Sequence, residues 1–345
     1  MEDNRLKKAF TPLMDAIERI NSNPELKKIQ DDGYEFILED RLAKIRAINE
    51  QYDLEHNAYI AFSGGKDSTV LHYLIDLALP NNNIPRVYLN TGIEYQEIRK
   101  FVQELAKNDN RIIVLNSGVN IKKMLQKEGY PFKSKVFSNV VEMYNRLGKV
   151  KTIRAFLGEV ETKNGNIKKG QFRCPNDLKY IFEQDNKLNF KISHLCCYKL
   201  KKEPAKKWAQ ENNKTITLTG IRKEEGGARL ATNCIIADKD NNLSRFNPLL
   251  VVNEEWENWF IKHNNIQLCK LYYPPYNFER TGCKGCPFDL HLQKDLDTME
   301  RLLPNEKKQC EILWEPVYDE YRRIGYRLRK KKDYEQISIF DLLED

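Results

Sequence analysis

The sequence lacks long apolar runs. None of its 345 residues belongs to a stretch of 18 apolar residues, so no membrane span and no membrane partner is predicted. The opening residues, MEDNRLKKAF, lack the apolar core of a secretory signal, and we therefore expect a cytoplasmic protein. Charged residues make up 31% and hydrophobic residues 41% of the chain, a balance typical of globular rather than disordered proteins.

A strong charge imbalance is also lacking. The net charge of +7 is small for this length and gives little indication of a polyanionic partner. Basic residues do gather near the C-terminal end, where they predict either a solvated helix face or a nucleic-acid contact. They are Arg322, Arg323, Arg327, Arg329, Lys330, Lys331 and Lys332.

Cysteines are present in number, but without an export signal they do not indicate a disulfide framework. In a reducing compartment, clustered cysteines are better interpreted as ligands of a metal ion or an iron–sulfur cluster. The eight are Cys174, Cys196, Cys197, Cys234, Cys269, Cys283, Cys286 and Cys310.

Short β-rich runs alternate with helical segments, and no internal repeat is visible. This alternation predicts an α/β fold with a doubly wound, mostly parallel sheet, which binds ligands at the carboxyl ends of its strands. Residues 1–56 are predicted to be helical, with apolar positions Phe36, Leu38, Leu42, Ile45 and Ile48 at helical spacing. Strands are expected at 58–62, 86–90, 111–115 and 215–219, and helices at about 67–79 and 94–107.

A glycine-rich loop lies between the first predicted strand and the helix after it. Its two glycines let backbone N–H groups approach an anion, and the helix N-terminus adds partial positive charge. This is not a Walker A loop, because Ile60 stands where that motif has its first glycine. The predicted phosphate-binding loop is Ser63, Gly64, Gly65, Lys66, Asp67 and Ser68, with an ammonium group from Lys66 and hydroxyls from both serines.

The string SGGKDS resembles the PP-loop of ATP pyrophosphatases and PAPS reductases, a superfamily with an adenine nucleotide alpha-hydrolase-like fold. Thr91-Gly92-Ile93-Glu94 resembles the DTG-x-E segment of that family, with Asn90 in place of the usual aspartate. Thr219-Gly220-Ile221-Arg222, followed by Arg229, resembles its TGxR…R segment, and Asn247-Pro248-Leu249 followed by Trp256 resembles its PL…W region. The resemblance implies nucleotide contacts from the loop and from Thr91, Gly92, Glu94, Gly220, Arg222 and Arg229, with catalytic roles for Lys66, Asp67 and Arg222.

We therefore expect a helical extension at 1–56 and a nucleotide-binding α/β domain at 57–245. The polar segment at about 130–195 is expected to be a less regular insertion. A cysteine-bearing helical region at 246–330 is expected to pack on the α/β domain, and residues 331–345 to form a flexible tail.

Four of the cysteines form a pair and a C-x-x-C, which together could bind zinc or a [4Fe–4S] cluster. Adjacent cysteines rarely reach one tetrahedral zinc without strain, whereas a cubane offers separate irons. The spacing of Cys196-Cys197 and Cys283-x-x-Cys286 resembles that of assimilatory APS reductases, which carry such a cluster; zinc or no metal are the alternatives. DNA-phosphorothioation sulfurtransferases of the superfamily carry a related cluster, so Cys174 is a substitute ligand for Cys196.

The family reductases need a nucleophilic cysteine in a motif like ECG-x-H near the C-terminus, and nothing here matches it. Cys310 lies in what we expect to be a plain helix, and it and Cys234 are expected to be structural. We therefore expect an ATP-using enzyme in which a substrate oxygen attacks the α-phosphate, pyrophosphate leaves, and a sulfur or nitrogen nucleophile displaces AMP. Mg²⁺ would bridge phosphate oxygens, with Asp67 or Glu94 beside it.

The resemblance implies sulfur from a cysteine desulfurase and a nucleic-acid acceptor, as in DNA phosphorothioation. A PAPS or APS reductase is one alternative, and a nucleotide- and cluster-binding sensor or subunit without turnover is another.

A short segment near the C-terminal end resembles the peptide by which bacterial proteins bind the DNA sliding clamp. Such peptides bind as extended segments whose glutamine and apolar side chains fill preformed pockets. The segment is Gln336-Ile337-Ser338-Ile339-Phe340, with Gln336, Ile339 and Phe340 as the expected contacts. Packing of these side chains back onto the domain is the alternative.

Overall fold

The computed structural model describes residues 24–160, 173–183 and 188–330. They form two compact units that alternate along the chain, and each is described by itself. The first unit runs to Tyr88 and adds Val102–Ile113 and Ala209–Cys269. The second contains Leu89–Phe101, Val114–Trp208 and the chain from Lys270 onward. The domain boundaries expected near residues 56, 245 and 330 stay predictions.

Six strands form one sheet in the order β3-β2-β1-β4-β6-β5. β1 pairs in parallel with β2 and with β4, β4 pairs in parallel with β6, and β5 alone is antiparallel. The prediction of an α/β fold with a mostly parallel sheet is confirmed, and two strands match their predicted bounds to the residue. The strands are β1 Ala58–Phe62, β2 Arg86–Asn90, β3 Ile112–Asn116, β4 Ile216–Leu218, β5 Ile235–Ala237 and β6 Leu243–Phe246.

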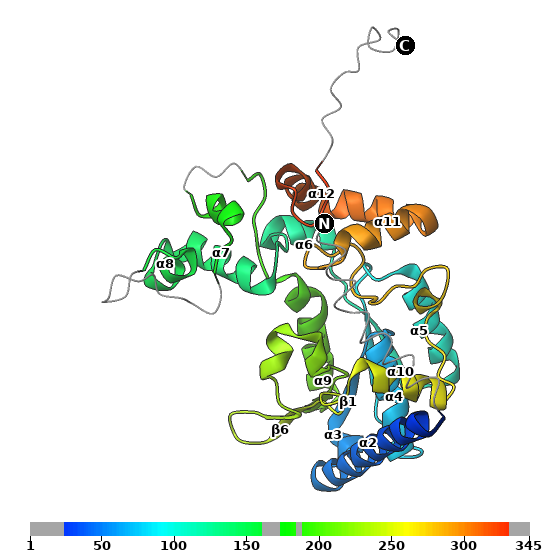
Figure 1. Cartoon of the computed structure of the whole chain (residues 1–345). Coiled ribbons are helices and arrows are strands. Elements are labelled where there is room, and N and C mark those ends of the chain that lie inside the picture. The colour runs from blue at the N-terminus through cyan, green and yellow to red at the C-terminus, as the bar shows by residue number, and fades with distance from the viewer. Residues whose placement is uncertain (1–23, 161–172, 184–187, 331–345) are drawn as a thin grey trace, which may run out of the picture. The chain divides into compact units, whose positions relative to one another are not determined.

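The long helix α2 lies against α4 in the first unit (Figure 1). Its Leu42, Ile45 and Ile48 are buried, as their helical spacing predicted. Phe36 is 76% exposed, so the buried face does not extend to it. The helices of this unit are α2 Pro24–Tyr52, α3 Leu54–Asn57, α4 Lys66–Ala78 and α10 Glu254–His263, with short turns η3 Lys223–Glu225 and η4 Gly227–Ala231.

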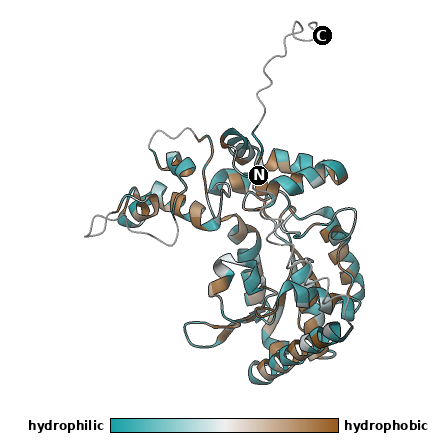
Figure 2. Cartoon of the chain, in the orientation of Figure 1, coloured by the Kyte–Doolittle hydropathy of each residue, from teal (hydrophilic) through white to brown (hydrophobic). Residues whose placement is uncertain are grey.

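The second unit is mainly helical in its described part, and the helices of both units alternate hydrophilic and hydrophobic faces (Figure 2). Among the described residues, none of the helices is both long and apolar enough to cross a membrane. The helices are α5 Gln96–Asn108, which crosses into the first unit, α6 Ile121–Glu128, α7 Lys135–Leu147, α8 Lys151–Leu157, α9 Glu203–Glu211, α11 Leu292–Leu302 and α12 Pro304–Ile324, with short turns η1 Asn176–Phe182, η2 Tyr198–Lys202 and η5 Lys270–Tyr272.

The expectation that residues 130–195 are less regular is wrong for much of that segment, because α7 and α8 lie within it. Local signals account for both helices. The Ser134 hydroxyl accepts a hydrogen bond from Phe137 N at 3.2 Å and caps the start of α7. Gly148 and Gly158, with φ of 69° and 75°, end the two helices in the left-handed region that favours glycine.

A buried charged network joins β2 to α4 in the first unit. Arg86, fully buried at the start of β2, donates to His72 Nδ1 at 3.1 Å and to Asn82 Oδ1 at 2.8 Å, and forms an ion pair with Asp76. Burial, with Arg86 beside it, lowers the pKa of His72 to about 4, so the ring is neutral and can accept this hydrogen bond. Because each of the three guanidinium nitrogens of Arg86 donates to an acceptor, the charge is tolerated inside an apolar core.

Candidate functional site

Residues 63–68, the predicted phosphate-binding loop, form the turn between β1 and the start of α4. Gly64 has a φ of 70°, which only glycine adopts readily. The hydroxyls of Ser63 and Ser68 lie 3.0 Å apart, and Ser68 also donates to the Gly65 carbonyl at 2.9 Å, so the two serines close the turn. Gly65 is the N-cap residue of α4 and makes no side-chain capping hydrogen bond, and the helix N-terminus adds partial positive charge to this turn.

The turn after β4 packs directly on this loop. A Cβ atom at Gly220 would lie 2.6 Å from the Asp67 carbonyl oxygen and 2.9 Å from its carbon. Any side chain at position 220 would therefore force the two backbones apart. Since β1 and β4 are parallel neighbours, their carboxyl ends meet at one edge of the sheet, and Gly220 permits the close contact there.

Lys66, the first residue of α4, is held by two carboxylates from α10. Its ammonium nitrogen lies 2.8 Å from Glu254 Oε1 and 3.3 Å from Glu257 Oε2, and only 11% of its side chain is exposed. Burial alone would lower the pKa of Lys66, but the two glutamates more than offset that effect and raise it. The lysine is therefore a permanent cation at the mouth of the loop.

Arg222 supplies a second cation to the same place. Its Nε donates to Asp67 Oδ1 at 2.9 Å, its Nη1 to Glu224 Oε2 at 2.8 Å, and its Nη2 lies 3.5 Å from Glu257 Oε2. Its side chain is 8% exposed. The structure thus brings together three residues predicted to be catalytic, Lys66, Asp67 and Arg222, in one network of charges.

Glu257 is the carboxylate that both cations share. It is fully buried, and among the described residues neither of its oxygens has a hydrogen-bond partner of good geometry. Burial, strengthened by the nearby Asp67 charge, raises the pKa of Glu257 to about 8, although Arg222 and Lys66 oppose the shift. A buried carboxylate with unsatisfied oxygens is unusual in a native structure and calls for an explanation in function.

Sequence reasoning missed Glu254 and Glu257. Only Trp256 was singled out in this segment, and it is fully buried, donating from its indole nitrogen to the Tyr34 carbonyl at 3.1 Å. It therefore packs α10 on α2. The available signal was the spacing of the two glutamates, which puts both carboxylates on one face at the start of α10.

Arg229, also predicted to bind nucleotide, lies in the same unit but makes a different contact. Its Nε is 2.9 Å from Glu225 Oε2, and 39% of its side chain is exposed. No described contact joins Arg229 to residues 63–68, so its nucleotide contact stays a prediction.

The segment after β2 belongs to the second unit, where Glu94 closes its own turn. Its Oε2 accepts from the amides of Thr91 and Gly92 at 3.0 and 3.1 Å, and its Oε1 accepts from the Thr91 hydroxyl at 2.6 Å. Lys201 lies 3.6 Å from Glu94 Oε1. Glu94, one of the two carboxylates predicted beside Mg²⁺, is thus already occupied by hydrogen bonds that a metal ion would have to replace. Asn90 donates from its side-chain amide to Asn116 at 2.9 Å.

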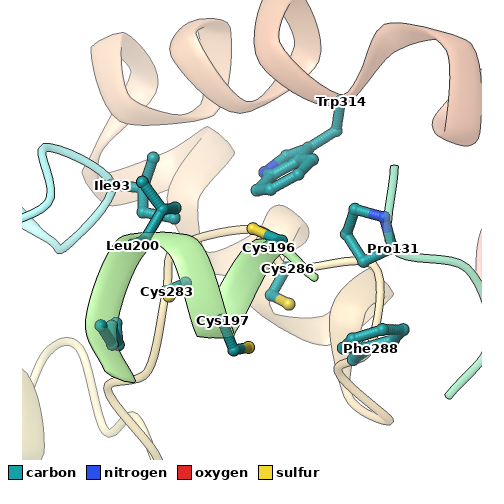
Figure 3. A pocket seen from close by; sticks show the side chains of 10 residues that line it. Ile93, Pro131, Cys196, Cys197, Leu200, Cys283, Cys286, Phe288 and Trp314 are labelled. Atoms are coloured by element: carbon teal, nitrogen blue, oxygen red, sulfur yellow. The ribbon is translucent and has the colours of Figure 1, made fainter. Parts of the chain in front are cut away.

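Four cysteines line one pocket in the second unit (Figure 3). Cys196 and Cys197 lie directly before η2, and Cys283 and Cys286 lie on a tight turn closed by a hydrogen bond from Cys286 N to the Cys283 carbonyl at 3.2 Å. Within the described residues, no three histidine, cysteine or acidic side chains are grouped closely enough for one metal ion. The remaining lining residues are Ile93, Pro131, Leu200, Lys201, Phe288 and Trp314.

These thiols are electrostatically coupled. Burial raises the pKa of Cys196, Cys283 and Cys286, and neighbouring cysteine charges raise it further. Lys201 lowers the pKa of Cys283 but does not offset the effect of burial. In the free protein the pocket therefore favours neutral thiols, and a bound metal centre would have to displace their protons.

Helix α12 supports the cysteine turn from behind. Trp314 donates from its indole nitrogen to the Lys284 carbonyl at 3.2 Å, and Tyr321 donates to the Pro287 carbonyl at 2.9 Å. Gly285 has a φ of 60°, and a Cβ atom there would lie 2.8 Å from the Cys310 sulfur. Cys310 is thus a packing residue, as predicted. Sequence reasoning missed the aromatic support, which carries no motif.

Cys174, the predicted substitute ligand, does not line this pocket. It is buried, its amide donates to the Phe156 carbonyl at 2.9 Å, and burial raises the pKa of its thiol to about 11. The structure therefore brings Cys196, rather than Cys174, to the other three cysteines.

The C-terminal basic cluster is largely engaged within its own unit. Arg322 pairs with Glu311 at 2.6 Å and Arg323 with Glu320 at 2.7 Å. Arg329 pairs with Asp297 at 2.7 Å. These pairs favour the solvated helix face over a nucleic-acid contact for the described part of the cluster.

The buried Glu257 predicts a pH dependence. Because its folded-state pKa lies above that of an unfolded glutamate, its cost to stability is absent below about pH 4.5 and grows as the pH rises toward about 8. Glu257→Gln should remove this cost and raise the free energy of unfolding at pH 8 by about 1–2 kcal/mol, with little change at pH 4.5. Urea unfolding at several pH values measures this effect. The exposed Glu255→Gln is the control, and equal pH profiles for wild type and Glu257→Gln would contradict the prediction.

The chain matches the phosphoadenosine phosphosulfate reductase domain family over residues 57–167 and 155–289. An uncharacterized protein of Methanocaldococcus jannaschii is 31% identical over 111 residues, which span 30% of this chain and 26% of that protein.

Solved structures with similarity include phosphoadenylyl-sulfate reductase from Candida auris, at 16% identity and a TM-score of 0.35, covering 62% of this chain and 76% of that one. FMN adenylyltransferase from Candida glabrata, in complex with ATP, has 14% identity and a TM-score of 0.37, covering 68% and 58%. NH3-dependent NAD synthetase from Campylobacter jejuni has 13% identity and a TM-score of 0.35, covering 85% and 96%.

The family match spans more than half of the chain and includes the phosphate loop, the Gly220 turn and all four pocket cysteines. This protein belongs to the phosphoadenosine phosphosulfate reductase domain family.

Proposed function

We propose that this protein binds ATP at the loop of residues 63–68 and uses it to adenylate an acceptor for sulfur transfer. The observation that carries the proposal is the pair of nearly buried cations, Lys66 and Arg222, sharing the underbonded Glu257 beside the uncapped start of α4. Cations and amides fixed before the reaction stabilise charge that develops on a leaving pyrophosphate. A sulfonucleotide would present similar anionic groups to the same residues.

In the proposed reaction an acceptor oxygen forms a bond to the α-phosphorus, and the bond from that phosphorus to the bridging oxygen breaks. Pyrophosphate leaves with the bonding electrons, and the acceptor hydroxyl releases its proton to solvent. Lys66 and the α4 amides would bind the departing phosphates, while Arg222 would orient them. A sulfur nucleophile then displaces AMP from the adenylated acceptor.

The carboxylates around the two cations would change partners when nucleotide binds. Glu254 neutralises Lys66 in the free protein and Glu257 lies 3.3 Å from the same ammonium group, and phosphate oxygens would take their place. Asp67, 34% exposed and bound to Arg222, is the carboxylate best placed to face Mg²⁺ held by the phosphates.

We propose a [4Fe–4S] cluster at the four pocket cysteines, which line one largely apolar pocket. In the described structure no three of these thiols are grouped closely enough for one metal ion, so binding would require the cysteine side chains to turn toward one another. Cys196, Cys197, Cys283 and Cys286 would hold it, and zinc is the alternative occupant of the same thiols. When bound, a cluster would supply electron-transfer or sulfur-binding chemistry. Lys201 would offset the negative charge of the coordinating thiolates.

A sulfonucleotide reductase reaction has less support. Cys310, the cysteine closest to the C-terminal end, is 1% exposed, and burial raises the pKa of its thiol to about 12. A thiol that is neither ionised nor accessible is a poor nucleophile. A protein that binds nucleotide without turnover remains the other alternative.

Replacing Lys66 tests the nucleotide site. We expect Lys66→Ala to weaken ATP binding at least tenfold, which corresponds to about 1.4 kcal/mol, because the fixed cation at the loop is lost. Calorimetry with Mg²⁺–ATP measures this change, and Lys44→Ala, an exposed lysine of the same unit, is the control. Unchanged affinity in Lys66→Ala would contradict the ATP site. Binding without pyrophosphate release in the presence of nucleic acid and a sulfur donor would favour the non-enzymatic alternative.

Anaerobic purification tests the metal centre. We expect about four irons per chain, with Cys283→Ser and Cys286→Ser each losing most of them, because each removes a thiolate ligand. Cys234→Ser, in the first unit, should keep the full iron content. Stoichiometric zinc without iron would contradict the cluster and support the alternative.

We also propose a cysteine desulfurase as sulfur donor and the DNA sliding clamp as partner of the segment Gln336–Phe340, which lies outside the described residues. Phe340→Ala should lower affinity for a purified clamp at least tenfold, because the aromatic side chain would fill a pocket. Ser338→Ala is the matched control. Equal affinity for wild type and Phe340→Ala in a surface plasmon resonance titration would refute this contact.

A further inference from the structure

Positive charge is concentrated in one short part of the second unit. Residues 121–157, which form α6, α7, α8 and their links, contain nine lysines and arginines and two glutamates, a net charge of +7. This equals the net charge of the whole chain, so the other 308 residues sum to zero. The modest overall charge therefore conceals a strongly basic segment.

Most of this charge faces solvent. Eight of the nine basic residues are exposed, whereas both glutamates are partly buried. We call these eight the basic helical surface: Lys122, Lys123, Lys127, Lys135, Arg146, Lys149, Lys151 and Arg154.

Few acidic groups neutralise the basic helical surface. Glu142 accepts from His194 and Ser193 at 3.0 and 3.3 Å. Glu159 lies 3.2 Å from Lys149 and 3.9 Å from Arg154, and Glu128 lies 4.0 Å from Lys127. Among the residues with described positions, the other five cations form no ion pair; they are Lys122, Lys123, Lys135, Arg146 and Lys151.

Helix stability does not account for this placement of charge. A lysine in the first turn of a helix is disfavoured by the helix dipole by about 0.3–1 kcal/mol. The first turns of α6 and α7 nevertheless contain Lys122, Lys123 and Lys135 and no acidic residue, whereas α4, α5 and α10 each begin with acids. Charge that weakens its own helices is better explained by an anionic partner.

The helices that carry this surface are anchored by an aromatic core. The ring of Phe182 lies 5.8 Å from those of Phe137 and Phe156 and 5.4 Å from that of Tyr144. Lys135 and Arg146 are eleven residues apart, close to three turns, so they point to the same side of α7 at a separation of about 16 Å. At about 3.4 Å per phosphate along one DNA strand, this separation spans roughly five nucleotides, so both cations can contact phosphates of a single backbone.

We propose that the basic helical surface binds the phosphodiester backbone of a nucleic acid. This inference rests on the proposed function in one respect: the nucleic acid bound at this surface would be the acceptor of the proposed adenylation. Exposed Val136, Leu147 and Val150 lie among the cations and would contact sugars or unstacked bases. Backbone contacts of this kind position a substrate without reading its sequence.

The test uses the full-length protein and fluorescent oligonucleotides of roughly 30 nucleotides, as duplex DNA, single-stranded DNA and RNA, between about 50 and 200 mM salt. The variant Lys135→Glu/Arg146→Glu/Lys151→Glu should bind its preferred probe at least tenfold more weakly, with a shallower salt dependence. The control Lys27→Glu/Lys28→Glu/Lys44→Glu changes net charge equally at exposed positions of α2 and should lose less than threefold.

Absence of nucleic-acid binding by the wild type, or equal losses in the two variants, would overturn the proposal. Binding of the wild type to vesicles rich in anionic lipid, with affinity equal to that for the oligonucleotides, would also overturn it. Both variants should bind Mg²⁺–ATP as the wild type does, which shows that they are folded. If the protein binds oligonucleotides but releases no pyrophosphate, the proposed reaction is refuted while nucleic-acid binding by the basic helical surface is retained. The two failures are therefore distinguishable.

Discussion

The direct contact between Gly220 and the first turn of α4 is the constraint on which the candidate phosphate site depends. With no side chain between them, the turn after β4 lies against the Asp67 peptide. This contact brings Arg222 to Asp67, and Arg222 and Lys66 then meet at Glu257. Parallel pairing of β1 and β4 puts both turns at one sheet edge, but only glycine at position 220 lets them touch.

The charges at this edge balance one another at the border between core and solvent. Lys66, Arg222 and Glu257 are largely removed from water, whereas Glu254, Glu224 and Asp67 reach the surface, with 58%, 52% and 34% of their side chains exposed. A buried ion has high energy unless it is paired, so the arrangement is stable only while both signs are present. A phosphate with its metal ion would preserve that balance, because it brings both new negative charge and a compensating cation.

Much of the fold could be predicted from the sequence. The strands at 58–62 and 86–90 are short apolar runs bounded by turn residues, and both were placed to the residue. The loop at 63–68 and the four pocket cysteines have local sequence motifs. The turn formed by the loop and the grouping of the cysteines could therefore be inferred. Glu254 could not, because it meets Lys66 only after a separation of 188 residues and has no motif of its own.

Other errors have equally physical causes. The helices within 130–195 are short and polar on their outer sides, so composition suggested irregular chain where caps and glycines form α7 and α8. Phe36 follows the apolar spacing of α2, but it is exposed because the buried face of the helix does not extend to it. The small net charge of the whole chain also hid the basic segment at residues 121–157, because the rest of the chain has no net charge.

The position of Trp314 has a consequence for observing the protein. This indole is fully buried, lines the cysteine pocket and is fixed by its hydrogen bond to Lys284. An iron–sulfur cluster absorbs at the wavelengths where indole emits, whereas Zn²⁺, a d¹⁰ ion, does not. Energy transfer to a cluster would therefore quench the fluorescence of Trp314, whereas bound zinc would not. The fluorescence of this tryptophan thus reports which metal centre the cysteines bind.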